Sequence, residues 1–245
     1  FNIEVLSTTD SAISDLSQHI EINNSNWDGR IIPTYRPDSV IDPDSCEFKK
    51  NLKKLGALTN EDINSWDGYL NAHKSRRLFF KEMGATATDH GHPTARTENL
   101  SYNEAEQLYK LVLAEEFNSE EADQFRGQML TEMAKMSCED GLVMQIHPGS
   151  RRNHSNKIFN QFGLDKGFDI PGATDYVSAL KPLLDEVGLR ADLTIILFTL
   201  DETSYSRELA PMAGVYPALK LGPPWWFFDS YEGMKRFRES TTETC

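Results

Sequence analysis

The sequence predicts an α/β fold in which a single domain, residues 1–245, forms an incomplete (β/α)8 barrel. Six short apolar segments alternate with helical patterns along most of the chain. This alternation is typical of parallel strands joined by right-handed crossovers. A closed barrel of this kind needs eight strand–helix units. The chain begins in a strand-like segment and has no evident helix after its last strand, so we expect a barrel that lacks its first and last units.

The six predicted strands are short and apolar, and polar side chains follow most of them. The carboxyl ends of parallel strands meet at one edge, where barrels and open α/β sheets carry their catalytic groups. We therefore expect the functional side chains at that edge. In chain order, the predicted strands cover residues 2–6, 30–35, 85–88, 142–146, 193–199 and 218–221.

The segments between the predicted strands carry helical signals. Ser101 and Glu104 form a capping box, so a helix is expected directly after Ser101. Another helix is expected to begin near Ser119, and Thr174 is predicted to cap a third. Region 47–84 is helical and longer than a crossover requires, so we interpret it as an insertion within the single domain.

The bulk composition is that of an ordinary globular protein with an acidic surface. The 245 residues carry a formal net charge of -13, which argues against a nucleic-acid partner because phosphates require a basic face. No apolar run is long enough to cross a bilayer. The three cysteines are widely spaced, as expected of reduced thiols. We predict a cytoplasmic protein without membrane partners.

Several common catalytic motifs are missing from the sequence. It contains no Gly-x-Gly-x-x-Gly pattern, no P-loop and no Gly-x-Ser-x-Gly elbow. Nucleotide cofactors and serine hydrolysis are therefore disfavoured.

His147 directly follows the predicted strand 142–146 and precedes a Pro-Gly turn. An imidazole at this position is suited to be a metal ligand or a general base in a polar cavity. The alternative is a histidine whose nitrogens are satisfied by backbone groups in the turn. Arg152, Asn153 and His154 follow shortly afterwards, and this accumulation of polar groups favours the functional interpretation.

A second polar group, Asp89-His90-Gly91-His92, follows the strand 85–88. In an extended chain, alternate residues point the same way, so His90 and His92 could share a metal ion. Gly91 and the proline that follows His92 indicate a turn, which weakens that hypothesis. We favour roles for Asp89 and His90 in substrate contact or proton transfer.

Arg36 and the aromatic pair Trp225 and Trp226 are further candidates for ligand contact. Arg36 lies between a strand and a proline that favours extended backbone, where a guanidinium can grip a carboxylate. The alternative for Arg36 is a surface ion pair with Asp38. We expect at least one of the tryptophans to form a cavity wall, because indoles pack well against sugar faces.

Taken together, these motifs resemble the uronate isomerase (glucuronate isomerase) family of the amidohydrolase superfamily. The resemblance covers essentially the whole chain, and the motifs occur in the family's order. The matching segments are residues 8–10, 35–38, 87–91, 144–147, 152–153 and 225–227.

The resemblance implies an aldose–ketose isomerase for hexuronates on a metal-dependent (β/α)8 barrel. Such enzymes interconvert D-glucuronate with D-fructuronate and D-galacturonate with D-tagaturonate, through a cis-enediol. The family uses one divalent metal, usually zinc, held by a His-x-His pair from the first strand, a histidine after the fifth and an aspartate after the eighth. A homo-oligomer is compatible with this interpretation.

By motif, His147 matches the fifth-strand metal ligand. Arg36 and Arg152 match arginines near the substrate, and Trp225 and Trp226 match the tryptophan pair bordering the pocket. The chain resembles strands two to seven only, so the remaining metal ligands are expected outside it. The isolated chain is therefore not expected to be a competent isomerase.

Two alternatives remain open from the sequence. One is a metal-dependent hydrolase on the same barrel, although no lysine stands at a predicted strand end before Lys220. The other is a catalytically inactive fragment that binds sugar acids without a metal.

Overall fold

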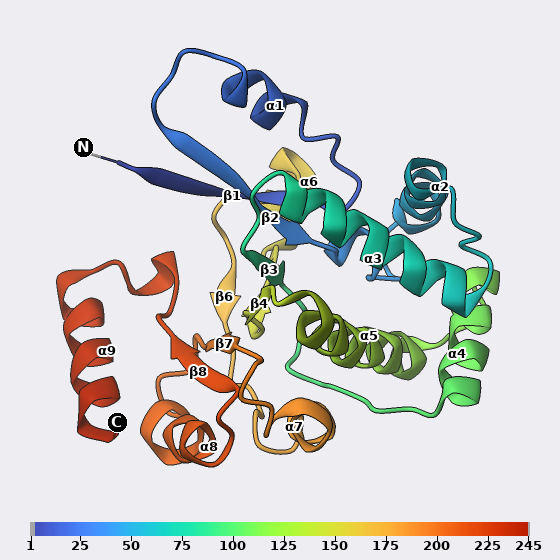
Figure 1. Ribbon diagram of the computed structural model, residues 1–245. Coiled ribbons are helices and arrows are strands. Elements are labelled where there is room, and N and C mark those ends of the chain that lie inside the picture. Colours follow the sequence, from blue (N-terminus) through green and yellow to red (C-terminus); the bar gives the residue numbers. More distant parts are fainter. Residues whose placement is uncertain (1–2, 245) are drawn as a thin grey trace.

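The computed structural model describes residues 3–244 and contains one six-stranded parallel sheet (Figure 1). Along the sheet the strand order is β1-β2-β3-β4-β7-β8, so each strand pairs with the preceding strand of the same sheet, and β5 and β6 pair separately. The predicted α/β class with parallel strands is therefore confirmed. The strands are β1 (Val5–Ser11), β2 (Arg30–Arg36), β3 (Ala87–His90), β4 (Val143–Ile146), β7 (Ile195–Phe198) and β8 (Leu219–Gly222).

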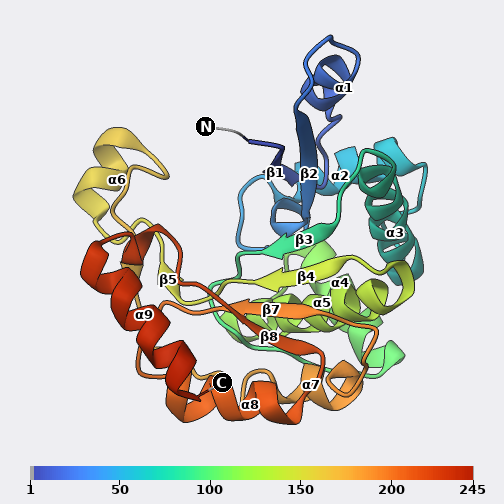
Figure 2. The ribbon, with the colours of Figure 1, turned by 60° about the vertical axis from the view of Figure 1, so that its left-hand side comes forward.

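The sheet is curved, and helices cover its outer side (Figure 2). A parallel pair needs a crossover connection, and helices that bury an apolar stripe against the sheet supply these crossovers. The covering helices are α3 (Trp66–Glu82), α5 (Ser119–Asp140), α7 (Lys181–Val187) and α8 (Ala210–Val215). Helix α2 (Phe48–Thr59) packs against α3, and α4 (Tyr102–Ala114) packs against α3 and α5.

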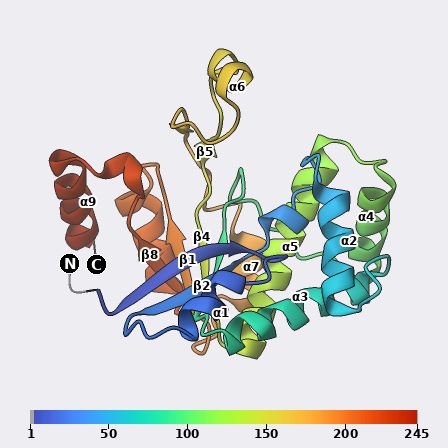
Figure 3. The same ribbon diagram turned by 90° about the horizontal axis from the view of Figure 1, so that it is seen from above.

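A small hairpin-like excursion projects away from the sheet beyond β4 (Figures 2 and 3). It consists of β5 (Ser150–Arg151), α6 (Asn156–Phe162) and β6 (Ile170–Pro171), with β5 and β6 paired antiparallel. Helix α1 (Ser17–Asn23) connects β1 to β2, and α9 (Tyr231–Thr244) follows β8. The short 3-10 helices are η1 (Asp38–Val40) and η3 (Trp226–Phe228), and a π-helix, η2 (Tyr205–Leu209), precedes α8.

The best-packed part of the core lies among α3, α4 and α5. Tyr69 of α3 stacks on Tyr109 of α4 with ring centroids 4.6 Å apart, and Phe125 of α5 stacks on Tyr109 at 5.9 Å. All three side chains are fully buried. Offset aromatic packing of this kind stabilises the core beyond simple area burial.

Most predicted strands and helices are confirmed, with shifted bounds. Residue 2, where the first strand was expected to begin, lies outside the described residues. Strand β1 instead extends through Asp10 to Ser11, because its polar second half pairs in register with β2. Strand β3 runs to His90 rather than stopping at residue 88. The capping box of Ser101 and Glu104 is present at the start of α4, and α5 begins at Ser119.

Two expectations at the carboxyl half of the chain were wrong. Thr174 does not cap a helix, because α7 begins only at Lys181, with a proline in its first turn. The hydroxyl of Thr174 donates instead to the carbonyl oxygen of Gly172, and its backbone N–H donates to Asp201. Helix α9 follows the last strand, where we expected no helix.

Region 47–84 contains α2 and α3, and α3 packs against β2 and α4. Its status as an insertion stays a prediction. Cys46 and Cys138 are free thiols, and Cys245 lies outside the described residues. Between residues 3 and 244, no helix combines the length and the apolar character needed to cross a membrane.

Candidate functional site

A cavity of about 320 Å³ opens at the carboxyl ends of the central strands. Strand register explains how its lining converges: Asp89 pairs with Gln145, and His147 lies two residues beyond Gln145 on the same face. The structure thus brings together five of the residues singled out from the sequence, Arg36, Asp89, His147, Arg152 and Trp225, and adds Gln145 and Phe198.

Asp89 is the centre of the polar contacts in this cavity. One carboxylate oxygen pairs with Nε2 of His147, and the other lies 3.4 Å from Nη1 of Arg36. Asp89 is 8% exposed and His147 is 9% exposed. Nδ1 of His147 is buried and has no hydrogen-bond partner among the described residues. Trp225 packs edge-on against His147, with ring centroids 4.5 Å apart.

Arg36 is held from the opposite side by Asp38. Its Nε donates to Oδ2 of Asp38 at 2.8 Å, and the backbone N–H of Gly91 donates to the same oxygen at 3.1 Å. The surface ion pair considered for Arg36 therefore exists, but it fixes the guanidinium beside Asp89. The role of Arg36 in contacting a ligand stays a prediction.

Gly91 allows these groups to approach each other. A Cβ at this position would lie 2.2 Å from Nη2 of Arg36, 2.9 Å from Cε1 of His147 and 3.0 Å from Oδ2 of Asp38. Each distance is at or below the closest approach of real Cβ contacts, so a larger residue would displace the site. Glycine here serves close packing.

His90 does not share the cavity with Asp89. Consecutive residues of a strand point to opposite faces, and β3 continues through His90. His90 is fully buried, and its Nε2 lies 3.0 Å from the hydroxyl oxygen of Thr88 on the same face. The two residues expected to act together are therefore separated by the sheet.

His90 instead lies with His92 and Asp38 in a group that could hold a metal ion. One potential ligand atom from each residue lies within 4.8 Å of the other two. Burial lowers the pKa of His90 well below its ordinary value and lowers the pKa of His92 to about 4. Both imidazoles are therefore neutral near pH 7, which is the form that binds metals.

The remaining candidates have more peripheral positions. The side chain of Arg152 is 41% exposed and forms an ion pair with Asp169 at 3.0 Å. Arg152 also lines a neighbouring cavity of about 940 Å³, together with Arg96 and Arg151. Trp226 is 55% exposed and stacks on Phe227, so its ring turns away from the first cavity.

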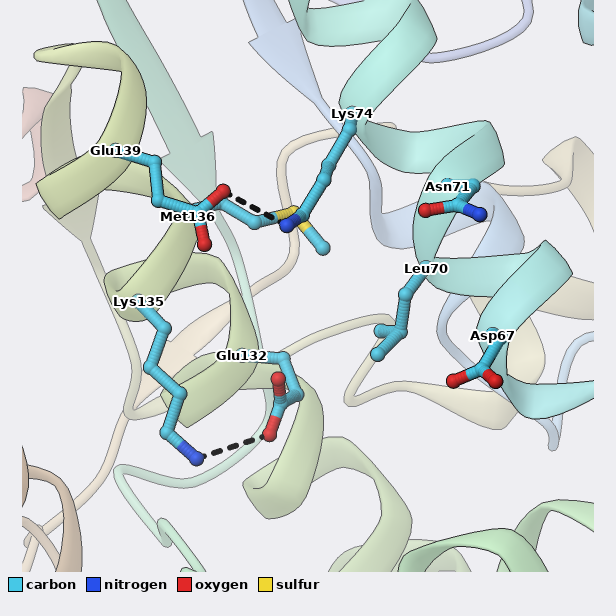
Figure 4. A pocket seen from close by; sticks show the side chains of 8 residues that line it. All are labelled: Asp67, Leu70, Asn71, Lys74, Glu132, Lys135, Met136 and Glu139. Carbon is cyan, nitrogen blue, oxygen red and sulfur yellow. Dashed lines mark hydrogen bonds and ion pairs between the residues drawn. The ribbon is translucent and has the colours of Figure 1, made fainter. Parts of the chain in front are cut away.

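A third cavity, of about 340 Å³, lies between α3 and α5 (Figure 4). Lys74 pairs with Glu139 at 2.7 Å, and Lys135 pairs with Glu132 at 3.1 Å. Its charges thus compensate one another, and these surface pairs require no bound ligand. This cavity is not a candidate active site.

Sequence reasoning missed Asp38, Gln145 and Phe198 as site residues. Asp38 was considered only as an ion-pair partner of Arg36. Gln145 had a visible signal, because it is the one polar residue within an otherwise apolar strand. Phe198 had no signal that separated it from ordinary core residues of a strand.

A parallel α/β sheet with histidine, aspartate and arginine side chains gathered at its carboxyl edge places the chain among α/β proteins that carry polar functional groups at strand ends. Within that class, the chain belongs to the glucuronate isomerase family, whose sequence model matches residues 1–244.

Individual relatives agree with this assignment. The chain is 66% identical to a uronate isomerase of Rhizobium meliloti (strain 1021), over 100% of this chain and 52% of that protein. The crystal structure of glucuronate isomerase from Caulobacter crescentus matches with a TM-score of 0.96 and 55% identity, over 99% of this chain and 51% of that chain.

A uronate isomerase structure from Thermotoga maritima matches with a TM-score of 0.91 and 29% identity, covering 98% of this chain and 53% of that chain. The chain thus spans about half the length of the curated relatives it matches.

Proposed function

We propose that this chain supplies strands two to seven of a (β/α)8 barrel that interconverts aldo- and keto-hexuronates. The substrates are D-glucuronate with D-fructuronate and D-galacturonate with D-tagaturonate. The observation that carries the proposal is Asp89, held between His147 and Arg36 on the wall of an open cavity. The family relationship supports the substrate class.

The reaction moves a proton between C2 and C1 through a cis-enediol, so it needs a base close to these carbons. Among the described residues lining the cavity, Asp89 alone carries a carboxylate. We assign the proton transfer to Asp89, with His147 and Arg36 fixing its orientation. His90 has no part in this step, because it lies on the other face of β3.

The substrate carboxylate is assigned to the arginines. Arg36 is already positioned by Asp38, so little side-chain entropy is lost when it binds an anion. Arg152 reaches the same cavity from the segment beyond β4. Trp225 provides an apolar wall for the sugar face, and Trp226 is expected to contribute only at the rim.

His147 fits the role of metal ligand. Its Nδ1 is buried without a partner, while its Nε2 contacts a carboxylate, and metal-ligating histidines commonly bind a carboxylate through their second nitrogen. A divalent ion, zinc by family resemblance, would polarise the carbonyl and hydroxyl oxygens of the open-chain sugar when bound. Its remaining ligands are expected outside this chain.

The decisive experiment compares the 245-residue chain with a polypeptide in which the first and last units of the barrel are restored from a relative. Both are given D-glucuronate and zinc, and the keto-acid product is followed. We expect turnover only in the restored protein, and a loss of at least about 100-fold in kcat with Asp89→Asn. Lys74→Met, in the cavity between α3 and α5, is the matched control and should keep full activity.

The outcomes separate the alternatives. If neither protein forms the keto-acid product, although each is shown to be folded, the isomerase proposal is overturned. Chelator-insensitive binding of glucuronate without turnover would identify a sugar-acid-binding protein. Turnover of amides or esters would identify a hydrolase, although none of the described residues lining the cavity is a lysine.

A further inference from the structure

A group of buried polar atoms at the carboxyl ends of β2 and β3 is not used by the proposed reaction. It comprises Oδ1 of Asp38, Nδ1 of His90, and both ring nitrogens of His92. These four atoms are inaccessible and have no hydrogen-bond partner among the described residues. A buried polar group without a partner costs about 1–3 kcal/mol, so an ion that engages one atom from each of the three residues would remove part of this cost.

We propose that Asp38, His90 and His92 form a second cation site, selective for zinc-like ions and separate from the cavity of Asp89 and His147. Its residues come from the ends of two adjacent strands, since Asp38 follows β2 and His92 follows β3. The site would join these two strand ends on the side of the sheet that faces the helices.

In two of the three ligands, His90 and Asp38, the second polar atom is already engaged in a pattern typical of metal sites. Nε2 of His90 lies 3.0 Å from Oγ1 of Thr88, so the tautomer with a free Nδ1 can donate to that hydroxyl. Oδ2 of Asp38 accepts from Arg36 and from the backbone of Gly91, which leaves Oδ1 free. Such partners orient metal ligands and strengthen binding.

The donor set indicates which cations fit. Two neutral imidazoles and one carboxylate suit zinc, cobalt or nickel, whereas magnesium and calcium prefer an all-oxygen shell. Tetrahedral zinc with ligands at about 2 Å needs donor atoms about 3.3 Å apart. The potential ligand atoms lie within 4.8 Å of one another, so binding requires an inward shift of at most roughly an ångström, with a fourth position for water.

The separation from the cavity follows from strand geometry. Asp89 and His90 are adjacent in β3 and point to opposite faces. Burial has the largest effect on the pKa of both imidazoles. His92 and Arg77 of α3 further lower the pKa of His90, and Arg126 of α5 lowers that of His92, which Asp38 and Asp42 raise; His147 of the cavity has a smaller lowering effect on both. Asp38 contacts both groups, and the backbone N–H of His147 donates to the carbonyl oxygen of His90 at 3.0 Å.

The test measures zinc binding to the full 245-residue chain, in the absence of any sugar. Affinity is measured by competition with a chromophoric chelator, and stoichiometry by elemental analysis after dialysis. We expect one tightly held zinc, an increase in Tm on adding zinc, and no such increase with magnesium. His92→Gln should weaken the tight site by about 100-fold or more and abolish the Tm increase.

His147→Gln is the matched control, because it removes a buried imidazole from the cavity instead. It should retain the tight zinc and the Tm increase. If His92→Gln does not fold by circular dichroism, His90→Gln provides the same comparison. Retention of zinc by the folded His92 or His90 variant, its loss in His147→Gln alone, or no zinc binding by the wild-type chain would each overturn the proposal. None of these readouts depends on isomerase activity.

Discussion

The two faces of β3 at its carboxyl end carry similar residue types in different environments. On the inner face, Asp89 pairs with His147 and Arg36 and lines a cavity open to small molecules. On the outer face, His90 is fully buried, and it lies with the buried His92 and with Asp38 in a group whose potential ligand atoms are within 4.8 Å of one another. One strand therefore separates an open cavity of about 320 Å³ from a buried group of polar side chains.

The difference shows that residue type alone does not assign a role at a strand end. An imidazole that reaches water can exchange protons with a substrate, whereas a fully buried neutral imidazole is better suited to bind a cation or to fill the core. The comparison also predicts that charge removal on the helix side of the sheet is costly and that charge removal at the surface is not.

The largest effect is expected for Arg77→Met on α3. Arg77 is 1% exposed, and its guanidinium donates to Asp140 and to Ser137 on α5. Breaking a buried pair leaves a carboxylate without its partner, so we expect a loss of about 3 kcal/mol in the free energy of unfolding by urea. Lys74→Met, one turn away on α3, also removes a cation paired with α5 but near the surface, and should cost less than about 1 kcal/mol. If the two variants lose equal amounts of unfolding free energy, the distinction between the buried pair and the surface pair is wrong.

A smaller effect, on both faces at once, is expected for Gly91→Ala. The new methyl group would collide with Arg36, His147 and Asp38. The surrounding side chains must shift to accept the methyl group, so we expect a loss of about 2 kcal/mol in the free energy of unfolding, measured with denaturant. Gly214→Ala in α8 is the control, because its Cβ would meet no atom within 4 Å and alanine favours helix. An unchanged stability in Gly91→Ala would show that the site is looser than described.

The smallest effect is a pH dependence from His73, another enclosed imidazole on the helix side. Burial lowers the pKa of His73 to about 3 in the folded chain, whereas the pKa of a histidine in the unfolded chain is about 6.5. As the pH falls below about 6.5, the unfolded chain therefore binds a proton at His73 and the folded chain does not. Stability should therefore fall as the pH is lowered through this range. Between pH 6 and 5, His73→Gln should lose about 1 kcal/mol less stability than the wild type. An equal loss of unfolding free energy between pH 6 and pH 5 in the two proteins would contradict this.

The sequence was sufficient to predict the alternating strands and the convergence of Arg36, Asp89 and His147. Apolar segments ending in polar groups reveal strand ends, and parallel pairing brings those ends together. The placement of His90 could not be predicted, because a shift of two residues in the end of β3 decides whether it remains in the strand and points outward.

Other misses have similarly local causes. Trp225 and Trp226 are sequence neighbours, but the 3-10 helix that begins at Trp226 turns the second ring away from the cavity. The start of α7 depended on the proline in its first turn and on Asp201, which binds the backbone of Thr174 from another segment. Contacts of this kind lie far apart in the chain, so local patterns do not reveal them.

The most direct test of the two-faced arrangement is diffraction from crystals of the zinc-soaked chain, with anomalous scattering recorded at the zinc edge. We predict the strongest peak on the helix side of β3, within bonding distance of Nδ1 of His90, Oδ1 of Asp38 and one ring nitrogen of His92. A strongest peak at Nδ1 of His147 instead, with none beside His90, would contradict the division of the two faces.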